Sequence, residues 1–104
     1  ANQLVQDAKN LESAGIFSLV LELVPSDLAQ KITNELTIPT IGIGAGPHTS
    51  GQVLVFHDVL GMNPDFNPTF LRKYMDGFSM ILGALNKYTK DVKSGEFPNG
   101  EESF

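Results

Sequence analysis

The sequence predicts an α/β fold in which helices alternate with strands, because short apolar runs separate segments that have helical periodicity. The first run, residues 19–24, is Leu and Val throughout except for Glu22, and Pro25 closes it. Two further apolar runs cover residues 40–44 and 52–57. Runs of this length are typical of strands that are covered on both faces, as in parallel sheets.

Length and composition limit the chain to one small domain and exclude several classes of function. It has 104 residues, of which 41% are hydrophobic, and a net charge of -5 at pH 7. This negative charge argues against nucleic acid and anionic membrane surfaces as partners. The absence of cysteine excludes disulfides, thiol nucleophiles and cysteine-bound metals. No apolar stretch approaches the roughly 20 residues that cross a bilayer. We therefore expect no membrane partner and a cytoplasmic protein, or one in an organelle such as the mitochondrion if the source is eukaryotic.

The first predicted element is a helix over residues 4–11, where apolar residues recur on one face. Gly15 is suited to a left-handed stop after it. The chain begins at Ala1, without a methionine, and enters this helix almost at once, so we expect a cut end of a longer protein. A strand from about Ser18 to Val24 follows the helix.

A second helix is predicted after Pro25, with Ser26 as its cap and Asp27 near the positive end of the helix dipole. Four apolar residues then recur on one face of this helix: Leu28, Ala29, Ile32 and Leu36. The helix is expected to end near Leu36.

The next two predicted strands are 40–44, with glycines along one side, and Gln52 to His57, which ends at Asp58. Eight residues separate Gly44 from Val53, fewer than the about ten to twelve of a parallel crossover. Spacing alone therefore favours an antiparallel hairpin for this pair.

A long helix is predicted to open at Asn67–Pro68, since Asn caps helices and Pro suits the first helical position. Apolar residues then recur at spacings of three and four at Phe70, Tyr74, Phe78, Ile81, Leu85, Tyr88 and Val92. Gly77 and Gly83 would divide or bend this helix. Its apolar stripe either contacts other parts of the protein or another subunit, or folds back on a small core of its own. Residues 95–104 are expected to form a solvated, turn-rich tail.

Glu22 is the main candidate for chemistry, because it lies in an apolar run with no charged neighbour before Asp27. Burying an unpaired carboxylate costs several kcal/mol unless the group takes up a proton. We therefore expect Glu22 to be buried and to have a partner, a proton or a catalytic role. The alternative is an edge-strand glutamate that points into water.

Other polar motifs are weaker. The glycines of Ile41–Gly46 have G-x-G-x-G spacing with no helix directly after them, so they more plausibly leave space for a ligand or for large side chains at a crowded strand end. His57 and Asp58 would point to opposite faces of a strand and so could not share a metal ion. His48 is expected to be solvated. No serine lies on a nucleophile elbow, which argues against a catalytic triad.

Three ordered motifs resemble the ketopantoate hydroxymethyltransferase family: Leu21–Pro25, Ile38–Gly46 and Gly51–Asp58. The segment Val92–Pro98 fits the same family. The resemblance covers essentially all 104 residues. It implies the last three strands and flanking helices of a (β/α)₈ TIM barrel with a long C-terminal helical segment, so that the 44–53 connection would be parallel.

In this reading the whole chain, 1–104, is the C-terminal part of a single barrel domain. Residues 1–66 would form barrel βα units, 67–94 C-terminal helices and 95–104 the tail.

The resemblance also implies an activity. Members of the family transfer a hydroxymethyl group from 5,10-methylenetetrahydrofolate to α-ketoisovalerate, using Mg²⁺, in pantothenate (vitamin B5) biosynthesis. The catalytic acid/base glutamate of the family falls on Glu22, which leaves open whether Glu22 takes the first proton or a later one. The family's Mg²⁺ ligands and substrate-binding lysine lie on earlier strands, so no metal site is expected in this chain.

The family further implies a ring-type homo-oligomer, as large as a decamer, assembled through C-terminal helices. The 104 residues alone, without the N-terminal part of the barrel, are expected to fold poorly and to be inactive.

Two other functions are compatible with the residues. One is a related lyase or mutase of the phosphoenolpyruvate/pyruvate barrel superfamily. The other is a non-catalytic acidic interaction or oligomerisation module whose long helix binds a partner.

Overall fold

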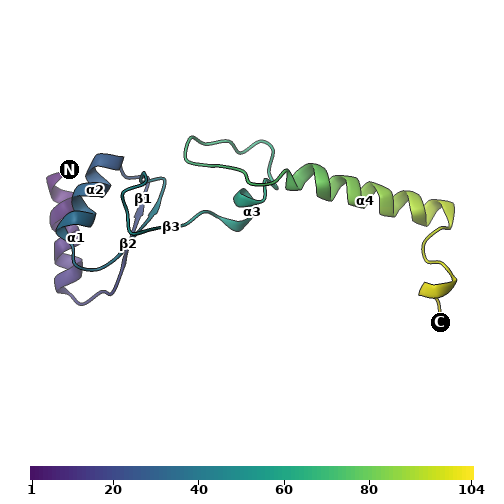
Figure 1. Cartoon of the computed structure of the whole chain (residues 1–104), viewed down its shortest axis with the longest axis horizontal. Helices are drawn as coiled ribbons and strands as arrows, with labels where there is room; N and C mark the ends of the chain where they lie inside the picture. The colour runs from purple at the N-terminus through teal and green to yellow at the C-terminus, as the bar shows by residue number, and fades with distance from the viewer. The chain divides into compact units, whose positions relative to one another are not determined.

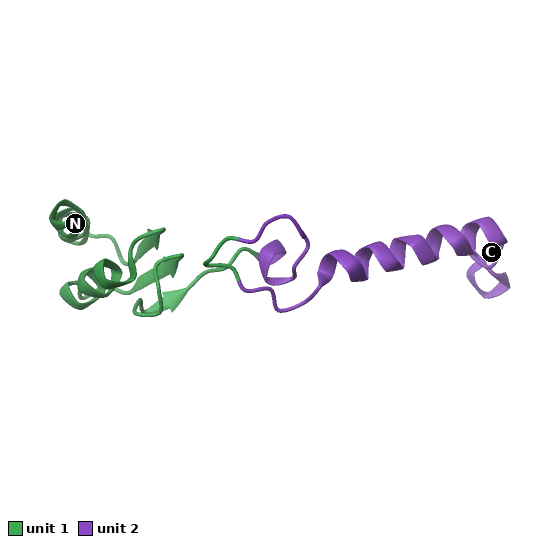
Figure 2. Cartoon of the chain, turned by 90° about the horizontal axis from the view of Figure 1, so that it is seen from above, with its two compact units in different colours: residues 1–55, 68–71 green, residues 56–67, 72–104 purple.

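The computed structural model of the chain describes all 104 residues, which form two compact units. Unit 1 comprises residues 1–55 and 68–71, and unit 2 comprises residues 56–67 and 72–104 (Figure 2). Figure 1 gives the order of the elements along the chain. None of the helices combines the length and the apolar character that crossing a membrane requires.

A three-stranded parallel sheet forms the centre of unit 1. Its strands are β1 (Leu19–Glu22), β2 (Thr40–Ile43) and β3 (Gly51–Gln52), in the order β1-β2-β3. Glu22 pairs with Ile43 across β1 and β2. The α/β prediction is confirmed. The parallel pairing of β2 with β3 shows that the hairpin favoured by spacing is wrong and that the connection implied by the resemblance is right.

Two hydroxyl side chains explain how so short a link can join parallel strands. The Thr40 N–H donates to Ser50 Oγ at 3.1 Å, and the Ser50 N–H donates to Thr40 Oγ1 at 3.2 Å. Thr40 Oγ1 also lies 2.7 Å from Thr33 Oγ1, and Thr40 is fully buried. These bonds fix the returning chain beside the start of β2 without a crossover helix, which the spacing rule assumes.

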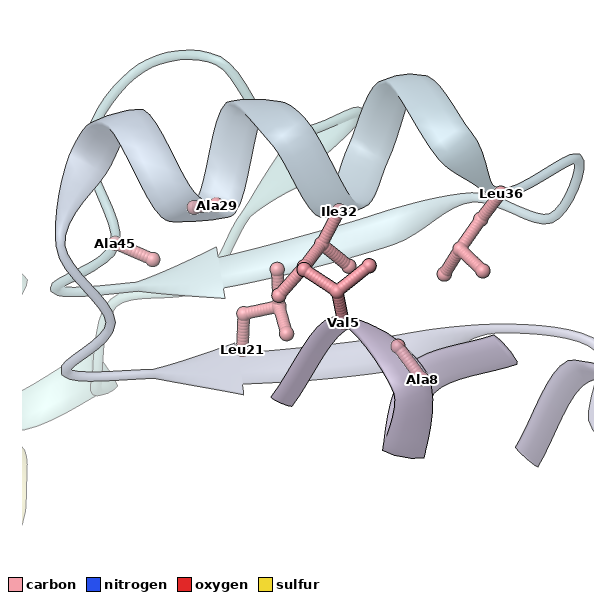
Figure 3. Close-up of a cluster of buried hydrophobic side chains, with 7 residues drawn as sticks. All are labelled: Val5, Ala8, Leu21, Ala29, Ile32, Leu36 and Ala45. Carbon is pink, nitrogen blue, oxygen red and sulfur yellow. The ribbon is translucent and has the colours of Figure 1, made fainter. Parts of the chain in front are cut away.

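Two helices cover one face of this sheet: α1 (Asn2–Ser13) and α2 (Ser26–Glu35). Apolar side chains of both helices meet the strands in a single buried cluster (Figure 3). Its members are Val5, Ala8, Leu21, Ala29, Ile32, Leu36 and Ala45. The predicted apolar faces of both helices are therefore confirmed, and Gly15 follows α1 with a left-handed φ of 99°.

Polar contacts also join α1 to α2 and to the segment after it. Lys9 forms an ion pair with Glu35. The Glu12 carboxylate accepts hydrogen bonds from the Thr37 hydroxyl (2.6 Å), the Thr37 N–H (2.7 Å) and the Ile38 N–H (3.1 Å). The hydroxyl bond from Thr37 and the two backbone bonds favour the charged carboxylate and hold the pKa of Glu12 below its ordinary value.

The predicted cap of α2 is wrong. Pro25 occupies the cap position, Ser26 is the first helical residue, and no side chain caps the helix. Pro25 has an extended backbone (φ -51°, ψ 139°), which already sets the direction in which the helix begins.

The third predicted strand is also shorter than expected. The sheet ends at Gln52, and one more backbone bond, from the Val53 N–H to Gly42 O at 2.9 Å, follows it. Because β2 turns out of the sheet at Gly44 with a φ of 66°, later residues have no strand to pair with. His57 and Asp58 therefore lie on a short helix, α3 (Phe56–Val59), and not on a strand.

Unit 2 contains α3, the helix α4 (Gly77–Ser94) and the 3₁₀ turn η1 (Gly100–Glu102). Within unit 2, backbone hydrogen bonds join residues 56–67 to residues 72–104. One of them runs from the Gly77 N–H to Leu60 O at 2.7 Å. A Cβ at Gly77 would overlap Leu60 O, and a Cβ at Gly61 would overlap Met75 O. Both positions therefore require glycine.

The long helix begins at Gly77, so the prediction that it opens at Asn67–Pro68 is wrong. The Asn67 amide donates to Pro64 O at 2.8 Å within a turn, and Asp76 is the cap that accepts from the Ser79 N–H. Phe70 and Tyr74 consequently lie outside the helix. Gly77 starts α4, and Gly83 lies inside it. Closure of a complete barrel and the assignment of 1–104 to one barrel domain stay predictions.

Candidate functional site

Glu22 is the last residue of β1. The register of the sheet places its side chain on the same face as Val20 and as Ile41 and Ile43 of β2, opposite the buried Leu21. This face, defined by Val20, Glu22, Ile41 and Ile43, is called the open face below. Val20 is 57% exposed and Glu22 is exposed as well.

The prediction that Glu22 is buried is therefore wrong for this chain. Helices α1 and α2 cover only the other face of the sheet, and β1 is its end strand. The Glu22 carboxylate makes neither a hydrogen bond nor an ion pair within the chain. Its exposure agrees with the alternative of an edge-strand glutamate, whereas its catalytic role stays a prediction.

The residue after Glu22 has an uncommon backbone conformation. Leu23 has a φ of 52°, in the left-handed region that residues other than glycine rarely adopt. Such a conformation costs about 1–3 kcal/mol and persists only where the surroundings impose it. The Leu23 N–H donates to Ile43 O at 2.9 Å, and the Leu23 side chain packs where a Cβ of Gly44 would otherwise lie.

The ends of β1 and β2 border a cavity of about 540 Å³ in unit 1, called the strand-end cavity below. Its walls come from residues 23–26, from Gly44 and Gly46, and from Thr69 and Phe70. The Phe70 ring lies 3.3 Å from the position of a Cβ on Gly44, and a Cβ on Gly46 would overlap Ser26. The prediction that these glycines leave space at a crowded strand end is confirmed.

A smaller cavity of about 250 Å³ lies between α1 and the free edge of β1. Glu22 lines it together with Leu4, Asp7 and other residues of the two elements. Val24 lines both cavities. Glu22 is therefore exposed but not remote from a cavity.

The remaining candidate residues do not join this site. His48 is exposed, as predicted. His57 and Asp58 belong to unit 2, where the His57 ring packs edge-on against Phe56 with 6.0 Å between ring centroids. No three His, Asp or Glu side chains of the chain lie close enough to hold a metal ion. These residues by themselves do not fit the Mg²⁺ that the resemblance implies, and no chemical step of this chain is assigned to one.

Sequence reasoning missed Leu23, Thr69 and Phe70 as parts of the site. The spacing of Phe70 predicts a place in a helical stripe, and nothing in the residue type of Leu23 indicates a left-handed backbone. The available signal was the glycine pair Gly44 and Gly46 directly after a strand, because bare strand ends admit large side chains from elsewhere in the chain.

Comparison with known proteins shows which family the chain belongs to. A family model described as ketopantoate hydroxymethyltransferase matches residues 1–100. Proteins named 3-methyl-2-oxobutanoate hydroxymethyltransferase are similar over the whole chain: 55% identical in Methylobacterium sp. (strain 4-46), 53% in Chlorobaculum tepidum and 51% in Bacteroides thetaiotaomicron. The chain spans 36%, 38% and 38% of the length of these curated relatives. On this match the chain belongs to the ketopantoate hydroxymethyltransferase family.

Proposed function

We propose that this chain contributes the last three strands of a (β/α)₈ barrel that transfers a hydroxymethyl group from 5,10-methylenetetrahydrofolate to α-ketoisovalerate, giving ketopantoate for pantothenate biosynthesis. The observation that carries this proposal is the family match over residues 1–100. The sheet is consistent with it, because barrel strands are parallel neighbours in sequence order with helices on the outside only. The open face would then line the barrel interior.

Glu22 is proposed as the acid/base residue of the reaction. The transfer replaces a C–H bond, at the carbon next to the keto group of α-ketoisovalerate, by a C–C bond to the methylene carbon of the donor. Water supplies the oxygen of the new hydroxyl group and tetrahydrofolate leaves, so protons must be moved at the substrate. Catalytic side chains of barrels lie at the carboxyl ends of strands, and Glu22 ends β1. A carboxylate without a partner on an otherwise apolar face does not stabilise the fold, whereas it is suited to general acid/base catalysis.

Replacing Glu22 by Gln tests this role in the full-length family protein that carries this sequence. The amide keeps the shape of the side chain but does not exchange a proton, so turnover should fall about 10²-fold or more with folding intact. Ketopantoate formation measured by mass spectrometry gives the rate, and circular dichroism checks the fold. Glu96→Gln, in the exposed tail, is the matched control. Near-normal turnover of Glu22→Gln would refute the role.

We also propose that α4 forms subunit contacts in a homo-oligomer. Seven of its large apolar side chains are more than 40% exposed in this chain: Phe78, Met80, Ile81, Leu82, Leu85, Tyr88 and Val92. Exposed apolar surface of this extent is uncommon on proteins that act as monomers and is typical of an interface.

A further inference from the structure

A link of three residues joins Glu22, at the end of β1, to Ser26, at the start of α2. We propose that the first of the three, Leu23, is a positioning residue that fixes the orientation of Glu22 for proton transfer. The inference rests on the proposed function for the role of Glu22, whereas the role of Leu23 rests on the backbone and the contacts of the link.

Each residue of this link has a restricted backbone. Leu23 lies in the left-handed region with a φ of 52°, and for residues other than glycine this region is only about 20° wide in φ. Val24 precedes a proline, which disfavours the helical region for it. The Pro25 ring fixes its own φ, which is -51°. The link is therefore a stiff connection between Glu22 and α2.

Both ends of this link are anchored in unit 1. On one side, Glu22 pairs with Ile43 in the sheet. On the other side, α2 buries Ala29 and Ile32 completely in the hydrophobic core. A stiff link between two fixed elements restricts the backbone of Glu22 to a narrow range of orientations. Proton transfer benefits from this restriction, because its rate depends on the placement of the transferring group.

Two contacts impose the left-handed conformation on Leu23. Its N–H donates to Ile43 O at 2.9 Å, which extends the pairing of the strands by one bond beyond Glu22. One methyl group of its side chain lies 2.8 Å from the position that a Cβ on Gly44 would take, and the Phe70 ring lies 3.3 Å from the same position. The Leu23 side chain thus occupies space that a side chain at residue 44 would remove.

Glycine would make the same turn at lower cost, because it adopts a positive φ without a steric penalty. Strained residues other than glycine cluster at active sites, where the surroundings hold them in one conformation. Leu23 follows Glu22 directly and has this property. We therefore expect the leucine to contribute to the placement of Glu22 more than to the stability of the turn.

Leu23→Gly in the full-length family protein that carries this sequence is the first test. Glycine adopts the left-handed conformation without strain, so the urea denaturation midpoint should stay close to that of the unsubstituted protein. Because glycine also adopts many other conformations, the orientation of Glu22 should broaden. The kcat should then fall by about 5- to 100-fold, the upper value being the cost of a misplacement of about 1 Å. The KM values of both co-substrates should stay within about twofold.

Two further variants control for the substitution itself. Leu23→Met keeps an unbranched apolar side chain and the narrow backbone range of a residue other than glycine, so its kcat should stay within about threefold of the unsubstituted value. Phe17→Gly is the matched control for added backbone freedom. Phe17 is 87% exposed and precedes β1, at the opposite end of the strand from Glu22. Its substitution should leave kcat within about twofold.

Leu23→Gly combined with Glu22→Gln separates positioning from a direct or a structural role. If Leu23 acts through Glu22, adding Leu23→Gly to Glu22→Gln should lower the residual kcat by at most about twofold. Any larger loss in this background shows that Leu23 acts on the substrate or on the fold, and it overturns the inference.

The same measurements separate the inference from the proposed function. A normal kcat in Leu23→Gly, together with a loss in Glu22→Gln, overturns the inference and leaves the proposed function standing. A urea midpoint that falls together with kcat, or an equal loss of kcat in Leu23→Met, also overturns the inference alone. Near-normal turnover of Glu22→Gln, or no ketopantoate from the unsubstituted protein, refutes the proposed function, and the inference fails with it.

Discussion

Different kinds of internal contact stabilise the two units of the chain. In unit 1, seven apolar residues from both helices, β1 and the loops that follow α2 and β2 form one buried cluster. In unit 2 the only buried residues are Gly61 and Gly77, and backbone hydrogen bonds join the segments around them. The difference indicates that unit 1 carries its own hydrophobic core, whereas unit 2 has apolar surface that its own residues leave uncovered.

Matched isoleucine substitutions test this comparison most strongly. Ile32→Ala removes a fully buried side chain from the core of unit 1 and should lower the free energy of unfolding by about 2–5 kcal/mol. Ile81→Ala, at a position on α4 that is 41% exposed, should change it by less than about 0.5 kcal/mol in the 104-residue chain. Urea denaturation of the 104-residue chain, followed by circular dichroism, measures both values and also tests the expectation that this chain alone folds poorly. Equal effects would contradict the difference between the units.

The same pair sharpens the comparison in the full-length protein. If α4 contacts another subunit there, Ile81→Ala should become costly and should make unfolding depend on protein concentration. Light scattering would then show a smaller assembly than that of the unsubstituted protein. An unchanged assembly would argue against the proposed role of α4.

Glycine substitutions test the backbone contact between Gly77 and Leu60 inside unit 2. Gly77→Ala places a Cβ against Leu60 O and should cost about 1–3 kcal/mol, because the backbone must move and its bond to Leu60 weakens. Gly83→Ala is the control. It adds a Cβ with nothing within 4 Å in a helix interior and should stabilise α4 by up to about 1 kcal/mol. Thermal melting of the helical signal distinguishes the two. A stabilising Gly77→Ala would show that the contact with Leu60 does not hold in solution.

The smallest expected effect is on the pH dependence of the stability of unit 1. The hydrogen bonds from Thr37 and Ile38 lower the pKa of Glu12 from its ordinary value of 4.5. Because the folded pKa is the lower one, the stabilisation is present above about pH 4.5 and is lost as the pH falls through the folded value. Glu12→Gln should therefore make unit 1 less stable at neutral pH and flatten its loss of stability in acid. Denaturation midpoints between pH 3 and 7 provide the test, with Glu101→Gln in the exposed tail as the control. Parallel pH profiles for Glu12→Gln and the unsubstituted chain would contradict it.

Most of unit 1 could be predicted because its helices and strands each bury one regular apolar pattern. Besides the cap of α2 and the length of the third strand, the main exception is the parallel link between β2 and β3. It depends on Thr40 and Ser50, whereas spacing alone favours a hairpin. Unit 2 was harder, since the start of α4 is set by the close approach of Gly77 to Leu60, two positions far apart in the sequence.

The candidate site shows the same division. The place of Glu22 at a strand end follows from the local apolar run. Its exposure could not be predicted, because whether a second layer covers the open face depends on residues other than its neighbours in sequence. The contact of Phe70 with Gly44 likewise joins two segments that no periodicity relates.

The reciprocal bonds of Thr40 and Ser50 have a consequence for evolution of the chain. A sheet pair aligned by a packed helix tolerates drift at many positions, whereas here two small hydroxyl side chains set the alignment. A slip of one residue would move Gln52 to the other face of the sheet and break the bond from its side-chain amide to Gly46 O, in the glycine turn that borders the cavity. These two modest residues would then be as resistant to replacement as a catalytic one.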